Sequence, residues 1–445
     1  MINFRSYPKM TKCVMPNGVK LSDIDFTNKF YSMTNLKTSI IPSNKIINMR
    51  QTYYRCSNLT GSPVCGNNVT DMDSTYYNCF NLTGNPVCGP NVISMDNTYC
   101  NCYNLTGSPV CGNNVIYFSS AYNECRNLTG NPICGDKVTS MYYTYWNCRN
   151  LTGSPVCGNN VINMVSAYAH CSNLTSSPVC GNNVTNMSGT YQFCSNLTGN
   201  PICGEKVINM RSAYFNCYNL TGSPVCGNNV TDMVQTYFCC HNLTGSPACG
   251  EKVTDMRLTY YECRNLTGSP VCGNNVASMY STYRDCTNLT GNPVCGEKVT
   301  DMWRTYFGCS NLTGSPVCGN NVTDMEQTYF GCRNLTGSPI CGEKVTKMGG
   351  TYSGCSNLTG NSYFYSLNVA NVQSCFYGRN NSTALNIYVI NGSKTHNTVL
   401  TNNASSLVGA AITWTDAGTY VYNTQYNIYI YPVADIAAAR AANGD

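Results

Sequence analysis

Apolar and polar positions recur along most of this chain with a period of 23 residues. The leucine of an Asn-Leu-Thr triplet marks the period, from Leu59 to Leu358 at constant spacing and without an insertion. Each period reads Cys-x-Asn-Leu-Thr-Gly, then Pro-(Val/Ile)-Cys-Gly, then Val-x-x-Met-x-x-(Thr/Ala)-Tyr, with few departures. A fixed period of this length predicts coils that stack into a solenoid, because each unit needs its neighbours to bury its apolar side.

Two segments of the repeat are predicted to have regular structure. The Pro-Val-Cys segment predicts a short strand, which the proline limits because it removes one backbone donor. After the Gly-x-x turn, Val69, Met72 and Tyr76 lie at i, i+3 and i+7, the spacing of one helix face. We therefore expect a repeat solenoid of the leucine-rich-repeat-like β type, with a short strand and a helical or 3-10 return in each coil.

Positions that do not vary between repeats are expected to contact their own copies in adjacent coils. The predicted structural columns begin with Cys56 and Cys79, Cys65 and Cys88, Asn58 and Asn81, and Tyr53 and Tyr76. The asparagine column is predicted to be buried and hydrogen-bonded to a turn of the next coil. Its triplets are also glycosylation sequons, but stacking explains their constant spacing better.

The period breaks down at both ends of the chain. Residues 1–49 are predicted to be an N-terminal cap with a degenerate repeat, 50–360 the regular solenoid, and 361–383 a degenerate capping repeat. Residues 384–445 lose the period and carry strand-like runs at 386–390, 411–415 and 426–431. This last part predicts a small β-rich module with a short tail.

Charge and hydropathy exclude some classes of partner. Only 11% of the 445 residues are charged and the net charge is +5, far from the dense basic field that nucleic-acid binding needs. No apolar run of 18 residues occurs, so no membrane span is expected. The first residues lack the apolar core of a secretory signal, which predicts synthesis in the cytoplasm with no evident signal peptide.

Most of the 31 cysteines lie in two columns, spaced alternately 9 and 14 residues apart. One interpretation is a reduced, small apolar residue in a tight core. The other is a disulfide between the two columns of each coil, as between Cys56 and Cys65. The cysteines outside the columns are Cys13, Cys100, Cys239 and Cys375.

No motif for catalysis, metal binding or cofactor binding is found. The cysteine spacing matches no zinc pattern, and the three histidines, His170, His241 and His396, are isolated from one another in the sequence. Neither a Walker-type loop nor a Rossmann-type glycine run occurs. The sequence therefore predicts a protein without enzymatic activity, catalytic residues, metal or cofactor.

The variable positions of the repeat carry the functional signal. The residue after the first cysteine mixes Tyr, Arg, His and Ser without Lys or Glu, and the positions after Met add Tyr and Trp. Tyr, Trp and Arg dominate interface anchors, whereas free drift on a soluble surface would bring Lys and Glu. Free drift and contacts with neighbouring subunits remain alternatives. The candidate binding-surface residues are Phe80, Tyr103, Arg126, Tyr142, Trp146, Arg149, Tyr218, His241, Arg264, Tyr280, Trp303 and Arg333.

The repeat resembles the BspA-like leucine-rich repeats and related bacterial surface-protein repeats, through Tyr-x-x-Cys-x-Asn-Leu-Thr after Val-x-x-Met. The resemblance covers roughly residues 30–382 and departs in the strand, where Gly-Ser-Pro-Val-Cys replaces the usual Ile-x-Ile-Pro. It implies extracellular attachment modules of bacteria, some protists and their viruses, and not enzymes. The C-terminal segment from LNIYV to YNIYIYPV resembles the tail ends of structural proteins of gut bacteriophages.

Taken together, the sequence predicts a virion or extracellular attachment protein, most concretely a phage tail fibre or adhesin. Its expected partners are a host-surface protein or glycan, or other virion proteins, and a homo-oligomer is expected. One alternative is an architectural subunit of a self-assembling filament or lattice without receptor binding. Another is a cellular surface adhesin.

Overall fold

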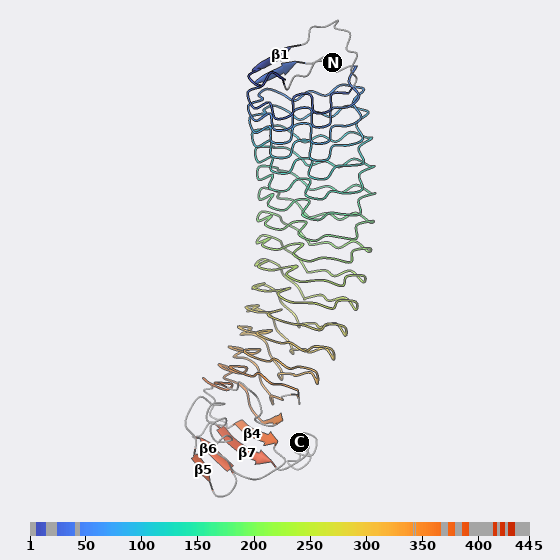
Figure 1. The fold of residues 1–445 in the computed structure, drawn as a ribbon. Coiled ribbons are helices and arrows are strands. Elements are labelled where there is room, and N and C mark those ends of the chain that lie inside the picture. The colour runs from blue at the N-terminus through green and yellow to red at the C-terminus, as the bar shows by residue number, and fades with distance from the viewer. Residues whose placement is uncertain are drawn as a thin grey trace. The chain divides into compact units, whose positions relative to one another are not determined.

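Each 23-residue repeat forms one coil, and within each unit successive coils stack in register (Figure 1). The computed structural model describes residues 6–14, 25–40, 45–340, 342, 344–365, 373–378, 385–390, 413–415, 419–422 and 426–431. It divides into two compact units, Met1–Thr221 and Gly222–Asp445. Coils of the same kind form both units, so the predicted repeat solenoid is confirmed.

Adjacent coils are joined at a single β-bridge position. In the first unit Asp71 pairs in parallel with Asn48 on one side and with Ser94 on the other. In the second unit the same position forms bridges from Asp232 to Lys347. Between residues 46 and 360, the described residues form no helix and no strand longer than such a bridge.

The return half of each coil is a series of turns. The amide of Thr75 donates to Met72 O at 3.0 Å within the coil, whereas the amide of Ser74 donates to Asp96 O of the next coil at 2.8 Å. Ser74 and Asn78 have φ angles of 53° and 60°, which an α-helix or 3-10 helix of L-residues does not contain. The predicted helical or 3-10 return is wrong, because alternate amides bond to the next coil instead of closing a helix.

The apolar residues of this segment nevertheless face inward as their spacing predicts. Val69, Met72 and Tyr76 have exposed fractions of 0%, 0% and 1%, and their equivalents are buried in both units. The buried tyrosines stack from coil to coil, with 5.5 Å between the ring centroids of Tyr76 and Tyr99 and 2° between their planes. Stacked rings of this kind form the core of each unit.

A tyrosine hydroxyl bonds to the backbone groups that a neighbouring strand would otherwise pair with. Tyr76 Oη donates to Val64 O at 2.8 Å, and Val64 N donates to Tyr76 Oη at 2.9 Å. The pair recurs in coil after coil, as far as Tyr329 and Val317. Because the hydroxyl satisfies both backbone groups of the residue after the proline, no ladder forms there. The predicted short strand is therefore absent.

Two more columns bond from coil to coil in the core. The thiol of Cys79 donates to Tyr53 O at 3.1 Å, and the hydroxyl of Thr75 lies 2.8 Å from both Met49 O and Met72 O. Each of these carbonyl groups also accepts a backbone amide of its own turn, so the side chains supply a second donor and tie adjacent coils together.

The asparagine column lies on the surface, so its predicted burial is wrong. Asn58 and Asn81 are exposed, while the leucine that follows each of them points into the core. Asn58 Nδ2 donates to Thr34 O at 2.8 Å, and Asn81 Nδ2 lies 3.4 Å from Asn58 Oδ1. The column is thus a ladder of asparagine side chains on the surface, and at its start Asn58 bonds to the backbone of the preceding coil.

The chain ends carry the only strands among the described residues. In the first unit β1, Lys12–Val14, pairs in parallel with β2, Thr38–Ile40. The second unit holds a five-stranded sheet in the order β3-β4-β7-β6-β5, whose strands are β3 Asn361–Tyr365, β4 Leu385–Ile390, β5 Thr413–Thr415, β6 Thr419–Tyr422 and β7 Tyr426–Tyr431.

Strands β3, β4 and β7 run parallel, and β7, β6 and β5 are antiparallel. Strand β3 lies in the segment predicted to be a capping repeat and joins the sheet beside β4. Strand β6 lies outside the predicted runs. The predicted tail and His396 fall outside the described residues. Within the described part of the chain, no helix has the length and apolar character needed to cross a membrane.

Candidate binding face

The outward side chains of the turn segment form one continuous surface in each unit. We term this surface the turn face and define it by the exposed or half-buried residues from the position after the buried methionine to the position after the first cysteine. All twelve candidate binding residues, from Phe80 to Arg333, lie on it and are exposed or half-buried. Alternate positive φ angles, as at Ser74 and Asn78, give this segment its turns.

Aromatic and arginine side chains contact one another along the turn face of the first unit. The ring of Phe80 stacks on Tyr103 with 5.2 Å between centroids, and the guanidinium of Arg126 lies 4.8 Å from the centroid of Tyr103. Arg126 Nε also donates to Glu124 Oε2 at 2.6 Å. The side chains of three successive coils are therefore held in a defined arrangement before any partner arrives.

A second cluster of aromatic side chains in the first unit contains the candidate binding residue Trp146 and the histidine His170. Trp146 lies edge-on to His170 at 5.5 Å, and His170 stacks on Phe193 at 4.5 Å. Burial, and then the Arg149 charge, lower the pKa of His170. The imidazole is consequently neutral near pH 7 and acts as one ring of the stack.

The second unit carries a file of four rings and one arginine on the turn face. In five consecutive coils, the residue directly after the buried tyrosine belongs to this file. These residues are Phe238, Tyr261, Arg284, Phe307 and Phe330. Phe238 stacks on Tyr261 at 4.4 Å, and Phe307 stacks on Phe330 at 4.8 Å. Between these pairs, the guanidinium of Arg284 lies 5.2 Å from the Tyr261 centroid and 5.0 Å from the Phe307 centroid.

A pocket of about 520 Å³ opens where this file of rings is interrupted. Ser353 occupies the next position of the file, and Tyr377 restores an aromatic ring one coil further on. The walls include Phe330 and Tyr377, which are 37% and 59% exposed. The lining also includes residues with short side chains or none, namely Gly349, Gly350, Ser353 and Gly354. We term this pocket the ring slot. Its remaining polar lining includes Glu326, Gln327 and Gln373.

Sequence reasoning selected Tyr, Trp and Arg by residue type, but it did not predict how they stack. It missed Tyr261, Arg284, Phe307 and Phe330 and the ring slot. The signal was available in the period, because residues 23 apart occupy the same position in adjacent coils.

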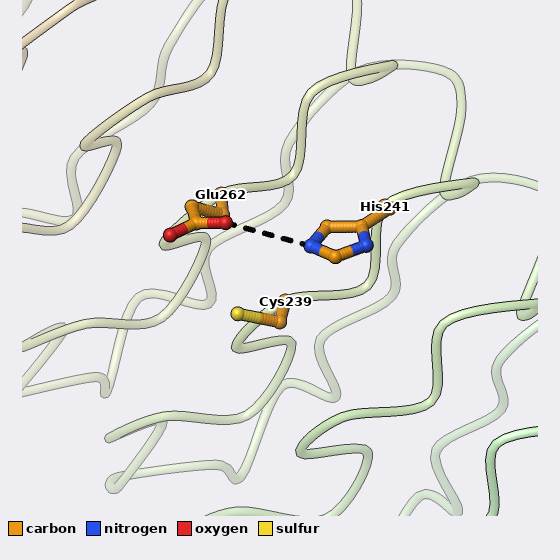
Figure 2. Close-up of side chains that lie close together, drawn as sticks. All are labelled: Cys239, His241 and Glu262. Atoms are coloured by element: carbon orange, nitrogen blue, oxygen red, sulfur yellow. Dashed lines mark ion pairs between the residues drawn. The ribbon is translucent and has the colours of Figure 1, made fainter.

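Three further residues of the second unit come together on the turn face. Cys239, His241 and Glu262 lie close together, with His241 Nε2 and Glu262 Oε2 3.6 Å apart (Figure 2). The thiol, imidazole and carboxylate atoms all lie within 4.8 Å of one another. Cys239 and Glu262 share one position of successive coils, two residues after the buried tyrosine, and both have a φ of 56°.

The electrostatics of this cluster are set by burial and one arginine. Burial, and then the Glu262 charge, raise the pKa of Cys239 to about 12, although Arg264 lowers it. Arg264 Nη2 donates to Glu262 Oε2 at 2.8 Å. The thiol is therefore protonated at neutral pH when nothing is bound. The sequence predicted no metal site, because the cysteine spacing was compared only with zinc motifs that are contiguous in the chain.

The cysteines in the described part of the chain are free thiols, which is the reduced alternative. Cys56 Sγ donates to Phe30 O of the preceding coil at 3.0 Å, whereas Cys65 Sγ donates to Gly66 O of its own coil at 3.6 Å. Burial raises the pKa of both thiols to about 12. The disulfide considered between these two columns is not formed.

A groove that the sequence did not predict lies outside the turn face, in the first unit. It has a volume of about 610 Å³ and is lined by side chains that include Ile116, Thr139, Ile162 and Thr185. Lys137 and Lys206 also line it, and each donates to an asparagine of the preceding coil at 2.7–2.8 Å.

Comparisons with known proteins give one partial family match and a similarity to solved structures. A model of the Kazal-type serine protease inhibitor domain matches residues 97–126, little more than one coil. The cysteines of that stretch are free thiols. A leucine-rich repeat protein from Bacteroides ovatus ATCC 8483 is similar in structure, with 14% sequence identity, a TM-score of 0.41, and coverage of 85% of this chain and 87% of that chain. No curated protein sequence matches.

The repeat solenoid of the present chain is established by its own coil-to-coil hydrogen bonds and ring stacks. What the chain does has to be argued from the turn face.

Proposed function

We propose that this chain is a non-enzymatic attachment protein, a BspA-like solenoid that presents its turn face to a partner outside the cell or on a virion. Its most concrete form is a phage tail fibre or adhesin that contacts a protein or glycan of a bacterial surface. The observation that carries the proposal is the stacking of aromatic and arginine side chains along the turn face of both units.

Stacked side chains form a contact surface that loses little conformational entropy on binding. Rings such as Tyr261 and Phe307 are held by neighbours in the coils before and after them, so binding immobilises few additional rotamers. Tyr, Trp and Arg also provide large contact areas and hydrogen-bonding groups, and they dominate the energetics of protein interfaces. A rigid file of such residues favours recognition of a partner over a merely solvated surface.

The ring slot is the place on this face that we propose for an anchoring contact. Arg284 provides an internal precedent, since its guanidinium lies between Tyr261 and Phe307 at 5.2 and 5.0 Å. Ser353 occupies the same position of its coil, between those of Phe330 and Tyr377, and contributes no planar group. A guanidinium from a partner fits there by the same cation–π contacts. The Glu326 carboxylate in the pocket lining complements its charge.

A filled slot provides a direct test of this anchoring contact. We expect a labelled tetra-arginine peptide to bind the full chain more tightly than tetra-lysine, because lysine lacks a planar cation. Ser353→Arg places a guanidinium in the slot from within and is expected to weaken arginine-peptide binding by at least about 10-fold. Gln192→Arg, at the same coil position in the first unit, is the matched control. Equal binding by the wild type and Ser353→Arg would exclude the slot.

Attachment itself is tested on cells. The fluorescently labelled full chain is expected to bind the surface of its bacterial host, and a variant with Tyr261, Phe307 and Phe330 replaced by serine is expected to lose most of that binding. A matched variant with three serines in place of the exposed Ile93, Ile162 and Ile208 should bind as wild type. Undiminished binding by the first variant would remove the turn face from the function.

A further inference from the structure

Three residues at variable positions of the repeat lie close together in the second unit. Cys239 is one of four cysteines outside the two columns, and His241 is one of three histidines in the chain. They are two residues apart, and Glu262 follows Cys239 by one period, since 262 − 239 = 23. The solenoid therefore places a thiol, an imidazole and a carboxylate in two adjacent coils (Figure 2).

The first unit contains the same arrangement without the thiol and the imidazole. Glu124 and Arg126 occupy the positions of Glu262 and Arg264, and each arginine donates to its glutamate, at 2.6 and 2.8 Å. In the preceding coil, Asn101 and Tyr103 stand where the second unit has cysteine and histidine. The glutamate and arginine pair thus belongs to the fold, whereas the added Cys and His need another explanation.

We propose that Cys239, His241 and Glu262 bind one zinc ion, with a fourth coordination position open to solvent. Sulfur, imidazole nitrogen and carboxylate oxygen are the usual zinc ligands, at about 2.0 to 2.3 Å from the metal. Tetrahedral ligands at such lengths lie roughly 3.3 to 3.8 Å from one another. The distance of 3.6 Å between His241 Nε2 and Glu262 Oε2 is within that range. All three ligand atoms lie within 4.8 Å of one another, so rotations of the side chains can bring them to coordination distances.

Binding forms a sulfur–zinc bond and releases the Cys239 proton to solvent, so no redox partner is needed. The thiolate and the Glu262 carboxylate together bring two negative charges to the divalent ion. Arg264 Nη2 donates at 2.8 Å to Glu262 Oε2, the same oxygen that lies 3.6 Å from His241 Nε2, and this hydrogen bond orients the carboxylate. Three protein ligands and one open position are the arrangement of zinc sites that accept an outside ligand. The site lies on the turn face but does not depend on the attachment proposed above.

The test uses the full chain, freed of metal and kept reduced with a phosphine. Titration with Co²⁺ is expected to give thiolate-to-cobalt absorption that saturates at one ion per chain and is displaced by Zn²⁺. In the variant Cys239→Asn with His241→Tyr, both positions take the residues found at 101 and 103, so the fold is retained. We expect this variant to lose the saturating absorption, with affinity lower by at least about 100-fold.

A gain of function completes the test. Asn101→Cys with Tyr103→His, beside Glu124 and Arg126, is expected to raise the stoichiometry from one ion to two. Glu262→Gln, which keeps the shape of the side chain, is expected to weaken binding with the cobalt–thiolate absorption retained. The proposal is overturned if the wild type binds no ion, or if the double variant at 239 and 241 binds as well as the wild type, since other cysteines would then hold the metal.

Discussion

Replacing Tyr191 with phenylalanine removes one oxygen atom from the core of the first unit and leaves the ring in its stack. Tyr191 Oη donates to Val179 O at 2.7 Å, and Val179 N donates to Tyr191 Oη at 2.9 Å. The substitution therefore leaves both backbone groups of Val179 without their partner. No other group of the coil has to move.

The expected loss of stability follows from those two groups. A buried donor or acceptor without a partner costs about 1–3 kcal/mol. Val179 is half-buried, so water reaches it in part, and we expect a loss of about 2 kcal/mol for the pair. Phenylalanine occurs at this position at the array ends, where Phe30 stacks on Tyr53 and Phe376 on Tyr352.

Urea unfolding followed by circular dichroism measures the free energy, and hydrogen exchange reports the Val179 amide. Tyr77→Phe is the control, because this ring stacks on Tyr54 on the turn face, and its effect should be below about 0.5 kcal/mol. We expect faster exchange at Val179 in Tyr191→Phe only. Unchanged stability together with unchanged exchange would refute the account of the missing strand.

Three further predictions concern pH, redox state and the turns. Burial raises the pKa of Cys56 to about 12 from an unfolded value near 9, so its contribution to stability is complete below pH 9 and is lost as pH rises toward 12. Each such thiol costs about 1.4 kcal/mol per pH unit in that window, and a melting temperature that stays level from pH 9 to 11 would contradict this. Dithiothreitol should leave the melting temperature unchanged, because the thiols are free; a fall of several degrees would indicate disulfides. Gly84→Ala should destabilise more than Gly61→Ala in urea unfolding, since both have φ above 80° but only at Gly84 would a Cβ meet Ser62 Oγ; equal losses would count against close coil contact.

The period predicted the coils and their inward residues because it records which positions meet their own copies. Val69, Met72 and Tyr76 are buried as predicted, yet the local spacing could not show that their backbone amides bond between coils. The predicted strand is absent for a related reason. Val64 finds its partner in a hydroxyl 12 residues away, and strand signals consider only neighbouring backbone.

The candidate binding residues were predicted by type, and each of the twelve lies on the turn face of its own unit. Their arrangement required the third dimension: the ring slot exists because Ser353 interrupts a file that Phe330 and Tyr377 continue. Asn58 was wrongly predicted to be buried, because a position that does not vary between repeats was taken to be a buried one. A ladder of exposed side chains that bond from coil to coil also keeps its residue type constant. Cys239, His241 and Glu262 were overlooked because zinc motifs are searched along the chain, whereas a solenoid assembles its sites across the period.

Electron microscopy of native particles that carry this chain tests the attachment proposal most directly. We predict chains that project from the particle, with the turn face that includes Tyr103 and Phe307 open to solvent and available to a host surface. A close-packed filament or lattice in which that face is buried between copies would contradict receptor binding and support an architectural subunit.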